Sequence, residues 1–162
     1  MKIIISPYSQ RLKDNRRNAK NYPYWNKIID AFKDTDTIIQ IGLSYEEKLN
    51  NVHEFKKDLD FDELENLVKL SDFWMSVDNF FPHFCNTIDS SGLVIFSKSD
   101  PMIYGYSRNI NILKDRKYLR HDQFGLWDEC AYDEESFIEP SIIIEIVNRI
   151  KNDKITLSKV TV

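Results

Sequence analysis

The chain has 162 residues, of which 42% are hydrophobic and 30% charged, and its formal net charge at pH 7 is -4. This size and composition predict one soluble globular domain, and the acidic balance excludes a nucleic-acid binder that works by bulk charge. No apolar window approaches the length of a membrane span. The two cysteines, Cys85 and Cys130, form no metal-binding motif, which predicts reduced thiols, no bound metal and a cytoplasmic location.

The first forty residues predict a strand, a helix and a second strand. The β-branched run 2–6, stopped by Pro7, is typical of a buried strand. The polar stretch 8–21 follows and predicts a loop that carries the densest positive charge of the chain. Residues 23–33 repeat apolar side chains at helical spacing, and 37–41 is another β-branched run. This order indicates a βαβ unit with a right-handed crossover.

The next segment is more polar. It predicts a short helix over 44–48 and a short strand over 52–55. Asp60, with Glu63 three residues later, has the pattern of a capping box, so a longer helix is expected over 61–70.

The second half of the chain continues the alternation. The apolar run 73–77 predicts a strand, 80–88 a helix and 93–96 another buried strand. Residues 110–113 are at best a short edge strand, and 114–135 predict a long irregular connection, which in an ordered protein is often functional.

The C-terminal region begins with Pro140 at the position of a helix start. Apolar residues then recur at helical spacing up to residue 150, and 154–162 resemble a loose tail. With no internal repeat and no linker, we expect one domain over residues 1–162. Alternating strands and helices predict an α/β fold, a single Rossmann-like domain with a mostly parallel sheet and helices on both faces.

The strongest candidate for a functional site follows the strand 73–77. Asp78 and His83 flank the point where that strand ends and the next helix begins. In open α/β sheets, ligands bind outside the carboxyl ends of the strands, and helix N-termini there favour anions. Asp78 therefore either binds a ligand or caps the helix, with Asn79 as the competing cap. His83, beside several phenylalanines, is either a pocket residue or a core histidine.

Several short motifs, taken in order, resemble those of one enzyme family. They are Ser6-Pro7-Tyr8-Ser9, Lys20-Asn21-Tyr22-Pro23, Ile39-Gln40-Ile41-Gly42 with Glu46 or Glu47, Val77-Asp78-Asn79-Phe80-Phe81-Pro82-His83, and Leu93-Val94-Ile95-Phe96 with Ser99-Asp100-Pro101. They resemble the C-terminal, nucleotide-sugar-binding half of a GT-B glycosyltransferase of the heptosyltransferase-like glycosyltransferase family 9. The resemblance as a whole spans roughly residues 2 to 150.

This resemblance implies a half of a GT-B fold that binds a nucleotide or a nucleotide-diphospho-sugar, without a metal or other cofactor. Lys20 would neutralise the phosphates, although a solvated loop lysine is the competing interpretation. The residues that it implies for binding are Ser6, Tyr8, Ser9, Lys20, Gly42, Asp78, Asn79, His83, Ser99 and Asp100.

Two departures from the family pattern bear on activity. The family has Ser-Gly after the aspartate, where this chain has Asn79-Phe80, and a phenylalanine obstructs the close approach of backbone to phosphate that glycine allows. The family also has a second, acceptor-binding half. We therefore hold two hypotheses: the donor half of a sugar transferase, completed by a second chain or a homodimer partner, or a non-catalytic nucleotide-binding or protein-interaction module.

Overall fold

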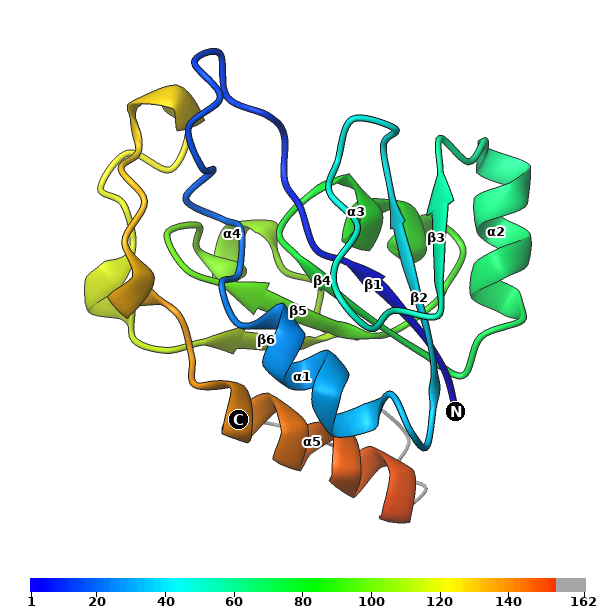
Figure 1. Ribbon diagram of the computed structural model, residues 1–162. Helices are drawn as coiled ribbons and strands as arrows, with labels where there is room; N and C mark the ends of the chain where they lie inside the picture. Colours follow the sequence, from blue (N-terminus) through cyan, green and yellow to red (C-terminus); the bar gives the residue numbers. More distant parts are fainter. Residues whose placement is uncertain (154–162) are drawn as a thin grey trace.

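The computed structural model describes residues 1–153, so the tail predicted over 154–162 lies outside the described residues. Six strands form one sheet in the order β3-β2-β1-β4-β5-β6, and all neighbouring strands are parallel (Figure 1). The strands are β1 Lys2–Ser6, β2 Thr37–Gly42, β3 Glu54–Lys57, β4 Phe73–Val77, β5 Leu93–Phe96 and β6 Ile110–Leu113.

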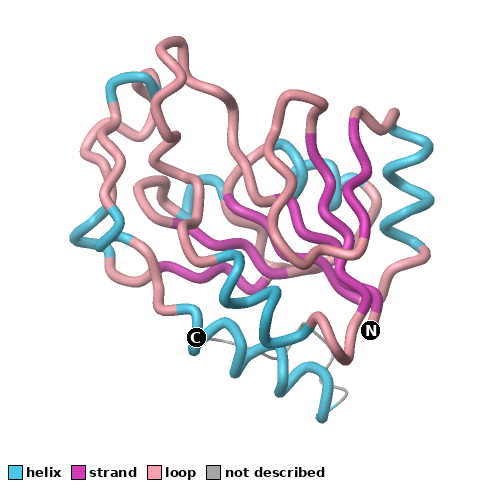
Figure 2. Tube along the Cα trace, viewed as in Figure 1, coloured by secondary structure: helices cyan, strands magenta, loops and turns pink. Residues whose placement is uncertain are grey.

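Helices cover both faces of this sheet, so the predicted α/β Rossmann-like fold is confirmed (Figure 2). The helices are α1 Trp25–Phe32, α2 Phe61–Lys69, α3 Phe80–Thr87, α4 Pro101–Tyr104 and α5 Pro140–Asp153. The strand order is that of the doubly wound fold, whose topology reverses next to the first strand.

The core divides into two layers because successive side chains of a strand point to opposite faces. In the central strand β1, Ile3 and Ile5 pack with α1 and α5, while Ile4 packs with α2 and α3. All three isoleucines are fully buried. The amphipathic helices predicted from the sequence therefore bury their apolar faces on the two sides of one β-branched sheet.

The predicted capping box at the start of α2 is present in full. The Asp60 carboxylate accepts a hydrogen bond from the backbone N–H of Glu63, and the Glu63 carboxylate accepts one from the backbone N–H of Asp60. This reciprocal pair satisfies two backbone donors that the helix itself leaves without partners.

One sequence prediction in the segment between β2 and α2 was wrong, and a second was displaced by two residues. Residues 44–48 form turns and bends instead of a short helix. Their backbone is held by the buried side chain of Gln40, which donates to the carbonyl of Glu47 and accepts from the N–H of Leu49. The strand expected over 52–55 is β3, which begins two residues later at Glu54.

The connection over 114–135 is largely irregular, as expected, with short 3₁₀ turns at Arg116–Tyr118, Trp127–Glu129 and Glu134–Ser136. It lies against the 8–21 loop: the backbone N–H of Lys13 donates to the Asp128 carboxylate, and the Arg16 guanidinium donates to the Asp128 carbonyl. These two loops follow β6 and β1 and stand at the same side of the molecule (Figure 1).

Candidate ligand-binding site

A cavity of about 630 Å³ opens where β1, β2 and β4 end, on both sides of the point at which the strand order reverses. Eight of the ten residues predicted for binding line it together. They are Ser6, Tyr8, Ser9, Lys20, Gly42, Asp78, Asn79 and His83. The rule that ligands bind outside the carboxyl ends of parallel strands therefore correctly placed most of the candidate residues at one cavity.

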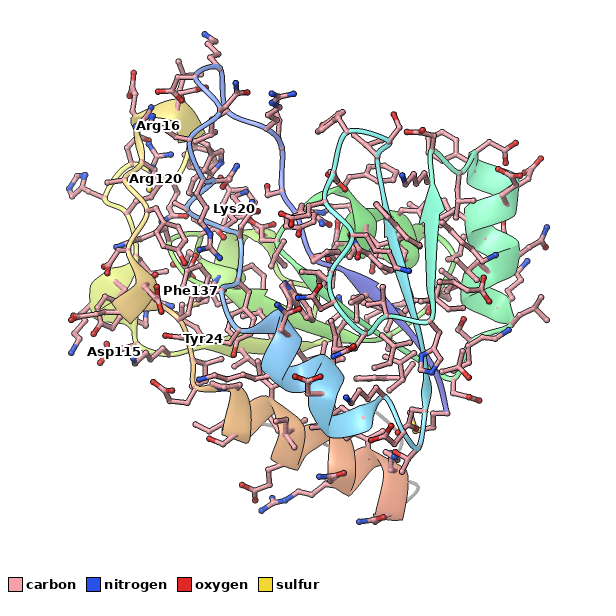
Figure 3. All side chains as sticks on the ribbon, viewed as in Figure 1. Arg16, Lys20, Tyr24, Asp115, Arg120 and Phe137 are labelled. Carbon is pink, nitrogen blue, oxygen red and sulfur yellow. The ribbon has the colours of Figure 1, made fainter. Side chains whose placement is uncertain are left out.

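The centre of the cavity is an ion pair between Lys20 and Asp78. The Lys20 Nζ lies 2.8 Å from the Asp78 Oδ2, and the two side chains are only 12% and 4% exposed. The ammonium group also lies 4.1 Å from the centre of the Trp127 ring and 5.7 Å from that of Tyr104. Lys20 is thus a held, partly desolvated cation and not the solvated lysine that the sequence left as an alternative. Figure 3 shows it at the base of the 8–21 loop, opposite the loop that carries Arg120.

The Asp78 carboxylate has fewer hydrogen-bond partners than a buried carboxylate usually has. Its Oδ2 is buried and held by the ion pair with Lys20, and its Oδ1 accepts no hydrogen bond from residues 1–153. The His83 Nε2 lies 3.9 Å from Oδ1. The opposite nitrogen of that ring, Nδ1, is 2.9 Å from the Tyr106 hydroxyl. Asp78 therefore presents a free acceptor to the cavity.

Asn79, and not Asp78, caps helix α3. Its Oδ1 accepts a hydrogen bond from the backbone N–H of Phe81, and its Nδ2 donates to the Tyr8 carbonyl at 2.8 Å and to the Ser6 hydroxyl at 2.9 Å. The side chain ties the exit of β1 to the start of α3. Because these bonds use its donors and its acceptor, the side chain of Asn79 positions the cavity wall, and Asp78 is left for a ligand.

The structure does not bring the other two predicted residues to this cavity. Ser99 is fully buried, and its hydroxyl has no hydrogen-bond partner in the described part of the chain. Asp100 caps α4 by accepting from the N–H of Met102 and pairs with the Arg116 guanidinium at 2.6 Å. These contacts lower the pKa of the Asp100 carboxyl, chiefly through the hydrogen bond from Arg116.

Gly42 makes room for a glutamate at the cavity wall. A Cβ at this position would lie 2.0 Å from the Glu46 Oε2, so any larger residue displaces that carboxylate. Glu46 Oε2 accepts a hydrogen bond from the N–H of Leu43 at 2.9 Å. Burial, with a smaller contribution from Asp58, raises the pKa of Glu46. Burial and the nearby Glu47 and Glu46 also raise the pKa of Tyr8, to about 12.

Sequence reasoning missed the aromatic residues that complete the cavity, above all Tyr104 and Trp127. Both come from segments that were predicted as irregular connections, and no short-range pattern marks them. The length of the 114–135 loop was the one available signal, because long ordered loops often contribute to sites.

Among residues 1–153, no group of three or more His, Cys, Asp or Glu side chains gathers as a metal site would require. Cys85 and Cys130 are both buried free thiols. No helix within this described range has the length and apolar character needed to cross a membrane.

No protein-family model matches the chain, and no curated protein matches it by sequence. One solved structure similar to it is that of the dodecameric iron-containing heptosyltransferase TibC in complex with ADP-D-beta-D-heptose. The two share 13% sequence identity with a TM-score of 0.56, over 85% of this chain and 35% of the heptosyltransferase chain. This chain therefore has a glycosyltransferase-like fold and spans about a third of that protein's length.

Proposed function

We propose that the chain binds a nucleotide or a nucleotide-diphospho-sugar in the cavity at the carboxyl ends of β1, β2 and β4, as a glycosyltransferase-like donor domain. The observation that carries the proposal is the Lys20–Asp78 pair at the reversal point of the sheet, in which a held cation lies beside a carboxylate whose Oδ1 accepts no hydrogen bond from residues 1–153. The similarity of fold to a heptosyltransferase supports the same function.

The size and lining of the cavity suit such a ligand. Its volume of about 630 Å³ lies within the range of small-molecule sites, roughly 300–1,000 Å³. Aromatic walls from Tyr45, Phe80 and Trp127 offer stacking surfaces for a base or a sugar ring. Lys20, Asp78 and His83 lie together at one place in this lining, which is typical of sites that orient one end of a ligand.

The two central residues have separate roles in this proposal. Lys20 interacts with the diphosphate as well as with Asp78. In a transfer reaction it stabilises the negative charge that grows on the leaving diphosphate as the bond to the sugar breaks. Asp78 accepts hydrogen bonds from ligand hydroxyls at Oδ1, which accepts none from residues 1–153 in the free protein. An acceptor and its base come from a second chain or from a homodimer partner.

A non-catalytic role remains the second candidate, and Phe80 is the residue that favours it. Phe80 stands at the cavity wall where the resembled family has glycine, and its side chain is 58% exposed. A phenylalanine there keeps the backbone of the α3 start away from a phosphate. A module that binds a nucleotide without transferring its sugar would keep the cavity and tolerate this change.

The test is the thermal stability of the chain against nucleoside mono- and diphosphates and nucleotide-sugars. A ligand at a hundred times its Kd adds about 2.7 kcal/mol, which for a domain of this size corresponds to roughly 5–10 °C. We expect one nucleotide class to give such a shift. Turnover of the matching nucleotide-sugar, with the chain alone or with a partner chain, then distinguishes the transferase from the module.

The variant that checks the site is Lys20→Met/Asp78→Asn, which removes both charges and leaves no unpaired ion in the cavity. It should abolish the shift, while Lys69→Met, a 62% exposed lysine at the end of α2, should leave it unchanged. A full shift in the double variant would overturn the assignment of this cavity. A panel without any shift in the wild-type protein would overturn the proposed function.

A further inference from the structure

A second, shallower pocket of about 330 Å³ adjoins the main cavity and has the opposite electrostatic character. The two share one wall, formed by Tyr8, Ser9 and Asn18 on one side and by Tyr45 and Glu46 on the other. The second pocket extends under the 8–21 loop and is lined by three of its arginines, Arg11, Arg16 and Arg17.

The charges of the two pockets differ in sign. The main cavity contains one lysine, already paired with Asp78, and two further carboxylates, Glu46 and Asp58. The second pocket is lined by three arginines and two carboxylates, Glu46 and Glu47, and Arg16 pairs in addition with Asp14 beside it. Because Lys20 is the one lysine or arginine of the main cavity and arginine forks match planar oxyanions, an anionic group beyond the one that Lys20 binds is better accommodated in the second pocket.

The guanidinium groups of this pocket are not equally engaged. Arg16 is occupied by Asp14 and by the carbonyl of Asp128. Arg11 donates from its Nε to the Asn15 side chain and lies 5.7 Å from the centre of the Tyr45 ring, with no other hydrogen bond or ion pair among residues 1–153. Arg17 stacks 4.4 Å from the centre of the Tyr132 ring and forms no hydrogen bond or ion pair with any residue from 1 to 153. Arg11 and Arg17 therefore retain free donors at the pocket.

The loop that presents these arginines is built into the fold. The Asn18 side chain is 3% exposed, donates to the Gln10 carbonyl at 2.8 Å and accepts from the N–H of Lys20 at 2.9 Å. The Asn21 side chain accepts from the N–H of Ser9 at 2.7 Å, and Leu12 is only 4% exposed. A loop fixed in this way loses little freedom on binding, which favours affinity.

From these observations we propose that the arginine pocket, defined by Arg11, Arg17 and the loop residues 15–18, is an anion subsite that binds a phosphate or carboxylate group beside the main cavity. The group belongs either to an extended ligand of the main cavity or to a second molecule, and the two sources share the same recognition chemistry. This subsite goes beyond the proposed nucleotide site, since it does not involve Lys20 or Asp78.

The test is isothermal titration of the full chain with pyrophosphate at low ionic strength, together with mapping of backbone amide shifts. We expect pyrophosphate to shift the amides of residues 9–18 and to bind the Arg11→Gln/Arg17→Gln variant at least about tenfold more weakly, the loss expected for two charge-assisted contacts. The matched control is Arg108→Gln/Arg149→Gln, which changes net charge equally at two exposed arginines outside both pockets.

The outcomes are separable from those of the nucleotide test. If pyrophosphate still binds when a nucleoside diphosphate saturates the main cavity, the anion comes from a second molecule. If the arginine variant weakens the nucleoside diphosphate but not the nucleoside, the anion is part of the main ligand. Undetectable pyrophosphate binding to the wild-type chain, or an equal loss in both double variants, would overturn the subsite. Arginine-dependent binding of pyrophosphate without any nucleotide binding would support the subsite and overturn the nucleotide proposal.

Discussion

Two buried aspartates at opposite ends of the sheet show how the molecule separates stability from binding. Asp36 lies just before β2, at the amino ends of the strands, and its side chain is fully buried. It accepts hydrogen bonds from the N-terminal ammonium group at 2.7 Å, from the Lys151 Nζ at 2.5 Å and from the Thr35 hydroxyl at 2.6 Å. Asp78, at the carboxyl ends, is almost equally buried but has one oxygen without a hydrogen bond.

The difference indicates what each end of the sheet is for. A buried carboxylate that is fully hydrogen-bonded fixes neighbouring elements, here β2 and α5. A buried carboxylate with an unused acceptor is costly to the free protein, and that cost is offset when a ligand supplies the donor. The comparison therefore predicts opposite consequences when each aspartate is replaced by asparagine.

Asp36→Asn should have the largest effect on stability. Removing one member of a buried charge cluster leaves the other charges uncompensated, which costs about 3 kcal/mol and lowers Tm by roughly 6–12 °C. Nucleotide affinity should be unchanged because the residue is at the far end of the sheet. Thermal unfolding followed by circular dichroism measures the effect, with the exposed Asp34→Asn as the control.

The pH dependence of the same variant provides a second check. Burial alone would raise the pKa of Asp36, but hydrogen bonds from Lys151, the N-terminus and Thr35 lower it below the ordinary 3.8. A depressed pKa contributes stability above the unfolded value that is lost as pH falls through the folded one. The wild-type advantage over Asp36→Asn should therefore shrink as pH falls below about 4. An advantage that is constant from pH 7 to pH 3 would contradict the electrostatic explanation.

Asp78→Asn should have the converse effect, reducing ligand affinity more than the stability of the fold. Loss of a charged acceptor costs about 1.5–3 kcal/mol of binding, a reduction of more than tenfold in nucleotide affinity. The free energy of unfolding should fall less than in Asp36→Asn, because Lys20 keeps its contact with the Trp127 ring and lines the cavity. Calorimetric titration and thermal unfolding of both variants measure the contrast. Equal losses of stability in the two variants would end the distinction between the two aspartates.

The sequence was informative about the scaffold because the scaffold is periodic. The isoleucine-rich run of β1 reflects burial on both faces of the sheet, and the helical spacing of α1 reflects burial of one helix face. Burial of this kind produces the periodic pattern of apolar residues that the sequence shows. The helix expected over 44–48 does not form because the side chain of Gln40, in the preceding strand, hydrogen-bonds the backbone of Glu47 and Leu49. A contact of this kind has no periodic signature.

The candidate site was predictable only where it follows the strands. Asp78 comes directly after β4 and Gly42 is the last residue of β2, so chain order placed them at one edge. Trp127 reaches the cavity from a loop more than a hundred residues beyond Lys20, and its position depends on how that loop folds back over the sheet. Whether Asp78 or Asn79 caps α3 was likewise undetermined until the Asn79 contacts with Ser6 and Tyr8 were known.

Replacing Glu46, which lines the cavity, should give the smallest and most specific effect on stability. Burial raises its pKa from the ordinary 4.5, and Asp58 adds to the shift, so the folded state disfavours the charged form. An acid whose folded pKa is raised loses stability as pH rises through that value. Glu46→Gln should therefore be more stable than wild type at pH 7, by less than about 1 kcal/mol, and equal to it near pH 4. Urea unfolding at both pH values measures this difference, with the exposed Glu129→Gln as the control. A gain of the same size at both pH values would indicate improved packing by the amide and not relief of a buried charge.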